Sequence, residues 1–318
     1  MRTTRRIALA TAALSAVLLS GCAQGGPGGD AGADEGAFTV GATTYSRSFE
    51  FYQDIEKGME EGAGDQIAYQ FQDPNGDLAA QTAQIEDFVA KGVDLVTMVP
   101  IDSDAGEAAG RLVTDAGIPL ITVDIGLTAD VGQTAHIESD NKEGGELAAT
   151  KMAELLGGTG QVFIISNPAI TPVVDREKGF TEKLKEIAPD IEVVASQSGD
   201  SKREQAQAVA EDLLQAHPDT TGIFAVNDEM ALGALQAVIA AGLQDQISII
   251  GFDASSEGLE EIAKGDSPFK ASVAQDPVTL GKVVSETALK VLNGETVEKV
   301  IEVPVTLVDE SNYESYQK

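Results

Sequence analysis

The chain has 318 residues, 42% of them hydrophobic, which is enough apolar material for a sizeable buried core. Its 52 acidic residues against 21 Lys and Arg give a formal net charge of −31, which excludes a basic patch for nucleic acid and disfavours adhesion to anionic lipid headgroups. The part from residue 38 onward, about 280 residues, favours two domains because single hydrophobic cores stop growing near ~250–300 residues.

Residues 1–21 have the pattern of a lipoprotein signal peptide. Arg2, Arg5 and Arg6 precede an apolar run that is too short to span a bilayer, and a Leu-Ser-Gly string stands directly before Cys22. A buried core helix is the alternative interpretation of this run. The flanking charges and the cleavage string favour export instead, through either the general secretory or the twin-arginine route.

Cys22 is the only cysteine, so the chain can form no internal disulfide. Its position resembles a lipobox, whose thiol takes a diacylglyceryl group. The residues that follow are Gly-rich and acidic without large apolar side chains, and such a segment cannot bury enough surface to fold. We therefore expect residues 22–37 to be a lipidated, flexible tether that holds the protein at the extracytoplasmic face of the cell membrane.

Beyond the tether, short β-branched runs alternate with amphipathic helical segments. Leu78, Ile85 and Phe88 lie on one face of a predicted helix, and Gly92 and Gly242 stand where helices should end. This alternation indicates parallel sheets with right-handed crossovers. The predicted strands cover residues 38–42, 67–72, 93–99, 118–123, 161–165, 191–197, 222–226, 247–252 and 270–274.

The pattern of the first half recurs in the second. In each half an apolar strand ends in a polar residue that opens a helix, and the next strand ends in an aspartate, Asp124 or Asp253. Ligands of open parallel sheets bind beyond the carboxyl ends of the strands. Two such domains facing each other would place these aspartates on opposite walls of one cleft. A turn or cap role is the alternative for each, and their matched positions favour the cleft.

Further polar and aromatic residues are candidates for the same cleft. Asn227 and Asp228 end a strand and begin a helix, where one of them is expected to be an N-cap. Arg176 lies near a helix start, where it is either a surface cation paired with a neighbouring carboxylate or a fork of donors for ligand hydroxyls. Phe51 and Tyr52 are adjacent in a predicted helix, so at least one is free to stack on a ligand. This combination suits a sugar, which has an apolar ring face and an equator of hydroxyls.

The strings around these candidates resemble a known family. NDEMALGAL, which starts at Asn227, and GFDA, which starts at Gly251, are near-verbatim strings of the periplasmic sugar-binding proteins of ABC transporters, in the ribose-binding, type I branch. REKGF, which contains Arg176, and VAQDP, which contains Gln275, support the same resemblance. It covers the chain from about Phe38 to the C-terminus.

The resemblance implies an α/β fold of two doubly wound parallel-sheet domains joined by three hinge crossings. The crossings would fall near residues 139–140, 275–276 and 303–305. The implied lobes comprise residues 38–139 plus 276–304 for the N-terminal lobe, and residues 140–275 plus 305–318 for the C-terminal lobe.

The resemblance also implies a ligand site and a mode of action. A monomer would close its lobes around a sugar or sugar alcohol and present it to the permease of an ABC importer. The implied ligand contacts are Phe51, Tyr52, Asp124, Arg176, Asn227, Asp253 and Gln275.

Three departures from the ribose binders bear on the choice of ligand. Ile125 stands where they have an arginine, Ser201 stands where an aromatic residue is expected, and the loop that starts at Thr43 is longer. The longer loop could bring Tyr45 or Ser48 into the site. These differences argue against ribose itself and for another pentose, a hexose or a polyol.

Other functions find less support. The chain has two histidines and no string typical of serine hydrolases, P-loop enzymes or zinc peptidases. The segment 73–77 begins like a calcium loop, but Leu78 stands where the loop needs glycine. We therefore expect no enzyme activity, no cofactor and no metal. A sugar-sensing repressor would need an N-terminal DNA-binding motif in place of the signal segment, whereas a receptor module that feeds a sensor or quorum response stays open beside transport.

Overall fold

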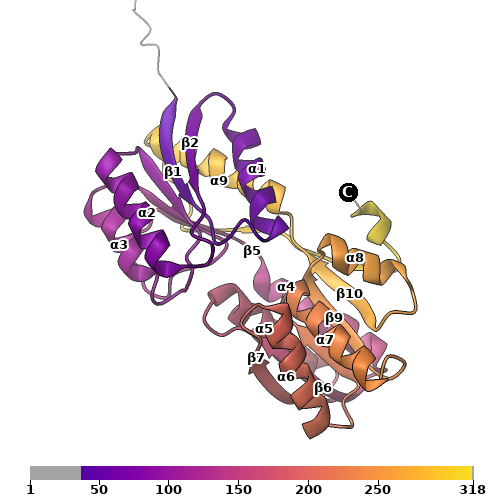
Figure 1. The fold of residues 1–318 in the computed structure, drawn as a ribbon. Coiled ribbons are helices and arrows are strands. Elements are labelled where there is room, and N and C mark those ends of the chain that lie inside the picture. Colours follow the sequence, from indigo (N-terminus) through magenta and orange to yellow (C-terminus); the bar gives the residue numbers. More distant parts are fainter. Residues whose placement is uncertain (1–36, 317–318) are drawn as a thin grey trace, which may run out of the picture. The chain divides into compact units, whose positions relative to one another are not determined.

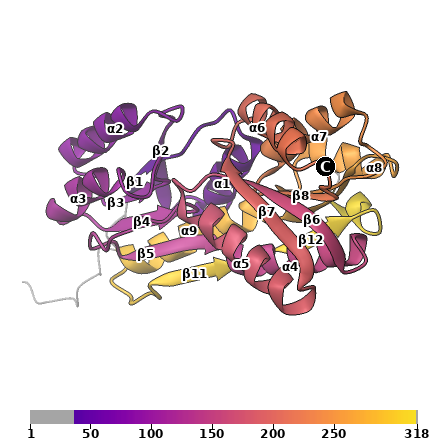
Figure 2. The same cartoon turned by 90° about the horizontal axis from the view of Figure 1, so that it is seen from below.

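The computed structural model describes residues 37–316, and residues 1–36 and 317–318 lie outside the described part. The predicted signal peptide, the lipidation site at Cys22 and nearly all of the predicted tether therefore fall outside it. The unit that begins at Ala37 contains two six-stranded sheets (Figures 1 and 2). No helix between residues 37 and 316 is long and apolar enough to cross a membrane.

The first sheet has helices on both faces, and we call this part the N-lobe. In spatial order its strands are β11 (Val300–Val303), β5 (Ala135–Ser139), β4 (Leu120–Val123), β3 (Leu95–Met98), β1 (Phe38–Thr43) and β2 (Ile67–Gln72). Its helices are α1 (Glu50–Ala63), α2 (Leu78–Lys91), α3 (Glu107–Asp115) and α9 (Pro277–Leu292). Successive residues of a strand point to opposite faces. Leu95 accordingly packs into the core under α1 and α9, and Val96 into the core under α2 and α3.

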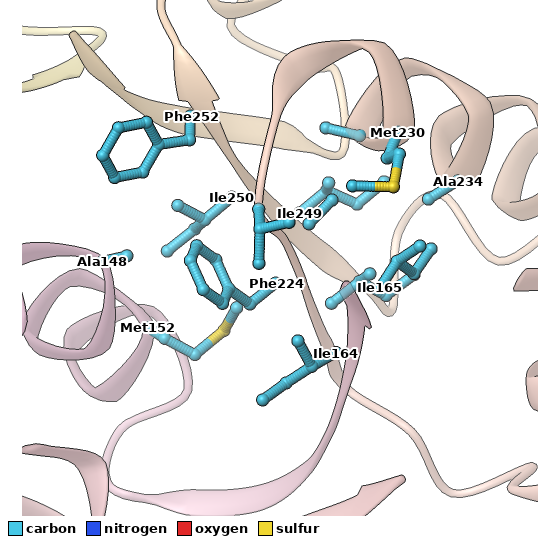
Figure 3. Packing of buried hydrophobic residues seen from close by; sticks show 14 of the residues in the cluster. Ala148, Met152, Ile164, Ile165, Phe224, Met230, Ala234, Ile249, Ile250 and Phe252 are labelled. Carbon is cyan, nitrogen blue, oxygen red and sulfur yellow. The ribbon is translucent and has the colours of Figure 1, made fainter. Parts of the chain in front are cut away.

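The second sheet has the same construction, and we call this part the C-lobe. In spatial order its strands are β12 (Thr306–Asp309), β10 (Phe269–Ala274), β9 (Ser248–Asp253), β8 (Gly222–Ala225), β6 (Thr159–Ser166) and β7 (Asp190–Ser198). Its helices are α4 (Asn141–Leu155), α5 (Thr171–Ile187), α6 (Arg203–Ala216), α7 (Asp228–Ala241) and α8 (Ser256–Ala263). Figure 3 shows Phe224 pointing toward Met152 of α4 on one face, and Ile249 pointing toward Met230 of α7 on the other.

The chain passes between the lobes three times. It crosses between β5 and α4, between β10 and α9, and between β11 and β12. The crossing at β10 brings α9 back beside α1, far away in sequence (Figure 1). This arrangement confirms the predicted α/β fold of two doubly wound sheets joined by three crossings.

One strand pair differs from the prediction of parallel sheets. β12 runs antiparallel to β10, whereas the other strand pairs in the described residues are parallel. Only Pro304 and Val305 separate β11 from β12, so no crossover helix reverses the chain before it enters the second sheet. Both of these strands were missing from the prediction. Each has four residues and lies at a sheet edge, where a short run gives little hydrophobic signal.

Candidate functional site

A cavity between the N-lobe and the C-lobe is lined by all seven of the predicted ligand contacts. Phe51, Tyr52 and Asp124 belong to its N-lobe wall, and Arg176, Asn227, Asp253 and Gln275 to its C-lobe wall. The lining is completed by Tyr45, Phe49, Ile125, Ile170, Pro172, Val173 and Ser201. These residues lie at the ends of strands or the beginnings of helices, as expected for a ligand site of open parallel sheets.

Asp124 follows the last residue of β4 in a strained backbone conformation. Its φ is 59°, and the Ile125 N–H donates to the Val123 carbonyl at 2.7 Å, which closes a tight three-residue turn around it. A three-residue turn with positive φ at its centre is the rare, strained form of this turn. Strain of this kind persists where the surroundings fix it, and it clusters at functional sites. The turn directs the Asp124 side chain into the cavity.

Asp124 and Tyr52 form a buried pair on the N-lobe wall. The Tyr52 hydroxyl donates to Asp124 Oδ2 at 2.9 Å, and the two residues are 9% and 4% exposed. Burial raises the pKa of Asp124, against the lowering effect of the Arg176 charge and of the Tyr52 hydrogen bond. Burial and the nearby Asp124 charge raise the pKa of Tyr52 as well, so Tyr52 remains a donor.

Asp253 is the last residue of β9 and has the corresponding position on the C-lobe wall. Its φ is 110°, again in the region that L-residues rarely adopt. Gln275 Nε2 donates to Asp253 Oδ1 at 2.7 Å, and Arg176 Nη1 lies 3.7 Å from the same oxygen. Burial raises the pKa of Asp253, while the Arg176 charge and the Gln275 hydrogen bond lower it.

Arg176 is buried, so it is not the surface cation that the alternative interpretation required. Its Nε donates to Asn141 Oδ1 and its Nη1 to the Val226 carbonyl, both at 2.8 Å. Its guanidinium lies 3.7 Å from the centroid of the Phe252 ring, a cation–π contact. Gly145 lets α4 approach this turn of α5, because a Cβ at residue 145 would stand 2.1 Å from the Arg176 carbonyl oxygen. The guanidinium is therefore held from three sides at the cavity wall.

Asn227 combines the two roles weighed for it. Its Oδ1 accepts the Met230 N–H at 2.9 Å as the N-cap of α7, and its side chain also lines the cavity. Asp228, the next residue, is 1% exposed and accepts hydrogen bonds from Ser255 and Ser272. Burial and then the charge of Asp253 raise the pKa of Asp228. The prediction that one of this pair is an N-cap is confirmed for Asn227.

Four aromatic rings gather in a single segment on the N-lobe wall. Tyr45 stacks on Tyr52 with ring centroids 5.7 Å apart, and Phe51 meets the same ring edge-on at 5.2 Å. Phe49 lies edge-on to Tyr45 at 6.0 Å. Of the two loop residues expected to enter the site, Tyr45 lines the cavity, whereas Ser48 is exposed and hydrogen-bonds to Ser46. No aromatic residue of the C-lobe belongs to the described lining.

Three apolar residues of the C-lobe wall were not predicted. Ile170, Pro172 and Val173 lie where the chain leaves β6 and begins α5. A usable signal was present, since this loop follows the carboxyl end of a parallel strand and proline is common in the first helical turn. Their apolar side chains resemble those of core residues, whereas the predicted ligand contacts are polar or aromatic.

Two buried acceptors of the cavity have no hydrogen-bond partner. They are Asp124 Oδ1 on the N-lobe wall and Gln275 Oε1 on the C-lobe wall. Buried polar atoms in native proteins nearly always have a partner, and leaving one without costs about 1–3 kcal/mol. Both atoms can only accept hydrogen bonds, so a ligand that satisfies them must donate to both walls.

The cavity has a volume of about 70 Å³. An engineered protein cavity of ~150 Å³ takes one benzene molecule. A monosaccharide is larger than benzene, so the two walls must move apart to admit one. The lobes also touch through residues outside this lining: Ser256 Oγ donates to Glu50 Oε2 at 3.0 Å, and Thr171 N–H donates to Ser103 Oγ at 3.0 Å.

A second cavity of about 290 Å³ lies near Ser103 and Thr171. Three carboxylates line it, those of Asp102, Asp104 and Asp175, and no aromatic residue does so. None of the buried atoms without a partner belongs to its lining. Within residues 37–316 no grouping of three or more His, Cys, Asp or Glu side chains is arranged to hold a metal ion. The smaller cavity is the better candidate for a ligand site.

Comparisons with known proteins agree with this fold. Residues 40–296 match the family model of the periplasmic binding protein domain. The chain is 35% identical over 273 residues to the ribose import binding protein RbsB of Bacillus subtilis (strain 168), an alignment that covers 85% of this chain and 87% of that protein.

Two solved structures are also similar. One is a solute-binding protein of an ABC transporter from Bacillus halodurans C-125 with bound myo-inositol, at a TM-score of 0.80 and 28% identity, covering 89% of this chain and 98% of that one. The other is a periplasmic solute-binding protein of an ABC transporter from Actinobacillus succinogenes 130z with bound D-allose, at a TM-score of 0.79 and 31% identity, covering 88% of this chain and 100% of that one. All three are binding proteins for a sugar or another solute.

Proposed function

The chain belongs to the periplasmic binding protein family, in its ribose-binding-like, type I branch, and from that premise we propose that it captures a neutral monosaccharide or sugar alcohol between its lobes and delivers it to an ABC importer. The proposed contacts are Phe51, Tyr52, Asp124, Arg176, Asn227, Asp253 and Gln275. The proposed lobes are residues 38–139 plus 276–304 and residues 140–275 plus 305–318.

The main support for this proposal is the pair of buried hydrogen-bond acceptors that have no partner. Asp124 Oδ1 and Gln275 Oε1 lie on opposite walls of one cavity, and each needs a donor. A polyhydroxylated ligand supplies several O–H donors at fixed spacing, and its oxygens can accept from Arg176. An acidic sugar is disfavoured, because the carboxylates of Asp124 and Asp253 outnumber the single guanidinium at the cavity.

Closure of the lobes is the proposed mechanism. The ligand would hydrogen-bond to both walls, and its preferential binding to the closed form would shift the protein toward that form. A shift from 1:99 to 99:1 needs about 5.5 kcal/mol of preferential binding. Hydrogen bonds to charged groups contribute ~1.5–3 kcal/mol each, so two to four of them across the cavity suffice. The permease would then recognise the closed shape.

Membrane attachment is proposed from the sequence. Cleavage before Cys22 and lipidation of its thiol would tether the protein on the extracytoplasmic face, close to the permease. A Cys22→Ala variant should then appear in the soluble fraction or the medium. Membrane attachment of that variant would contradict the lipid anchor without bearing on the ligand site.

A receptor module that signals to a sensor or quorum system is the second candidate. It uses the same site and the same closure, and it differs in the partner that recognises the closed form. Co-purification with a permease supports transport, and co-purification with a sensor kinase supports signalling.

The direct test is a thermal-unfolding screen of the wild-type protein against pentoses, hexoses and polyols. A ligand present at 100 times its Kd should stabilise the folded state by ~2.7 kcal/mol. At least one neutral sugar or polyol should raise the melting temperature in a saturable way, while the matching uronic acid should not. No response to any member of the panel would contradict the proposal.

A further inference from the structure

All four aromatic rings of the cavity come from residues 45–52, and Tyr45 lies in the loop that precedes α1. Hydrogen bonds fix this loop against the turn that follows β2. The Tyr45 carbonyl accepts the Gly76 N–H at 2.9 Å, and Ser46 Oγ donates to Asn75 Oδ1 at 3.2 Å. The N–H of the next residue, Arg47, donates to Asp73 Oδ2 at 3.2 Å. The backbone therefore holds the Tyr45 ring in place without help from the phenol.

The opposite wall presents a short side chain, that of Ser201, at the turn after β7. Ser201 has one of the smallest side chains in the lining, and its φ of 53° follows an equally left-handed Asp200 at 51°. Ser201 is nevertheless only 9% exposed, and its Oγ accepts from Asn167 Nδ2 at 3.0 Å. A small side chain that is almost hidden from solvent needs something larger to cover it.

Tyr45 has the position and size to provide that cover. It lines the same cavity as Ser201 although it belongs to the other lobe. Burial raises the pKa of Tyr45, and the charge of Asp200, the residue before Ser201, raises it further. Tyr45 also stacks on Tyr52, whose hydroxyl is fixed by Asp124. Tyr45 and Ser201 therefore line one cavity from opposite lobes, with a large ring on the N-lobe wall and a short side chain on the C-lobe wall.

We infer that Tyr45 and Ser201 are a pair of specificity-determining residues, in which the Tyr45 ring occupies the space left by the short Ser201 side chain and sets the size of the ligand. The pair admits single-ring sugars and acyclic polyols, and it rejects ligands with a substituent at this end of the cavity, such as glycosides and disaccharides. This inference rests on the proposed function, because it concerns the ligand of the same site.

Two substitutions and their combination test the inference. Ser201→His adds a ring to the C-lobe wall, and histidine tolerates a left-handed backbone better than other aromatic residues. Because the Tyr45 ring already fills this space, Ser201→His should weaken binding of the best sugar from the screen at least ~10-fold. Tyr45→Ala vacates the space and leaves the loop's backbone hydrogen bonds intact. The double variant Tyr45→Ala/Ser201→His should recover most of the loss.

Tyr45→Ala alone should change selectivity. It should bind the free sugar about 10-fold more weakly, since it loses one stacked ring, and it should gain a thermal response to the methyl glycoside of that sugar. Tyr313→Ala and Ser311→His are matched controls on the C-lobe outside the cavity, and both should bind like the wild type. Melting temperatures without ligand show whether each variant is folded, and Ser201→Asn replaces Ser201→His if the latter is not.

The outcomes separate this inference from the proposed function. If the wild type responds to no sugar or polyol, the proposed function fails. If the wild type responds, but Ser201→His binds equally well or the double variant binds no better than Ser201→His, the size pair is wrong and the sugar site remains. Rescue in the double variant together with a gained response to the glycoside supports the pair.

Discussion

The two walls of the interlobe cavity differ in chemistry although the two lobes share one architecture. The N-lobe wall is mainly aromatic and contributes one carboxylate, that of Asp124. The C-lobe wall has no aromatic ring in the described lining and contributes an arginine, two amides and a carboxylate. The repeated fold thus places the strand ends of the two lobes opposite each other. The loops that follow the strands determine which side chains line each wall. Stacking falls to one lobe and most hydrogen bonding to the other, so a ligand needs both lobes.

The largest effect on this division should come from Arg176 on the C-lobe wall. Arg176→Met keeps the aliphatic packing and removes the counter-charge of Asp253 together with the donor to Asn141. Breaking a buried pair by removing one partner costs about 3–5 kcal/mol, so the free energy of unfolding should fall by roughly that amount. Chemical unfolding measures it, and the ligand-induced thermal shift should be lost.

Lys178→Met is the matched control for this variant, since it makes the same charge change on an exposed position of α5. It should leave both stability and ligand response unchanged. A folded Arg176→Met protein with wild-type affinity would show that the C-lobe wall does not bind the ligand through its guanidinium.

A smaller effect is expected from Asp124 on the N-lobe wall. Asp124→Asn has nearly the same shape, and with the Tyr52 hydroxyl still donating to its oxygen it turns the orphan acceptor into a donor. A hydrogen bond to a charged group contributes ~1.5–3 kcal/mol, so affinity should fall about 10- to 100-fold while stability changes little. Calorimetric titration measures the affinity, with Asp104→Asn in the second cavity as the control. Equal affinity of Asp124→Asn and wild type would remove Asp124 from the site.

The pH dependence of stability should come mainly from the C-lobe. Burial raises the pKa of Asp228 and Asp253 above the values of the unfolded chain. The folded protein therefore binds protons that the unfolded chain releases, and the stability of the ligand-free form should be greater near pH 5 than near pH 7.5. Each kcal/mol corresponds to roughly 2–4 °C in melting temperature for domains of this size.

Asp228→Asn removes one of the two titrating groups, so its melting temperature should change less between these pH values than that of the wild type. The comparison of slopes cancels the general effect of the protein's net charge. Parallel slopes for the two proteins would contradict the raised pKa of Asp228.

The smallest effect is expected from a single ring of the aromatic wall. Phe51→Leu keeps an apolar surface but loses the aromatic face, which is worth about 0.5–1.5 kcal/mol, so affinity should fall ~2- to 12-fold. Phe71→Leu is the control, because Phe71 stacks on Tyr69 in the same lobe and lies outside the cavity. If Phe51→Leu lost as much affinity as Asp124→Asn, stacking on the N-lobe wall would contribute as much to binding as hydrogen bonding, which would contradict this ranking.

The features predicted from the sequence were those fixed by local patterns. Matched strand ends located Asp124 and Asp253, since the end of a buried parallel strand is visible as a change from apolar to polar residues. The REKGF sequence and the location of an arginine near a helix start indicated Arg176. Its contacts with Asn141 and Phe252 depend instead on tertiary packing. No local pattern in the sequence predicts these two contacts.

The features that escaped prediction depend on long-range geometry. Ile170 and Val173 line the cavity as apolar residues, and only their position after the carboxyl end of β6 distinguishes them from core residues. The entry of Tyr45 and the exclusion of Ser48 follow from hydrogen bonds between the loop and the turn after β2. The antiparallel β12 follows from the short link at Pro304, a crossing that only the assembled sheets reveal.

The most direct test of the central claim is a crystal structure with the sugar or polyol that gives the largest response in the thermal screen. The ligand should lie between the lobes and donate hydrogen bonds to Asp124 Oδ1 and Gln275 Oε1 together, with its ring or chain against Phe51 and Tyr52. A ligand held in the second cavity near Asp102 and Asp175, or one that touches a single lobe, would contradict the account.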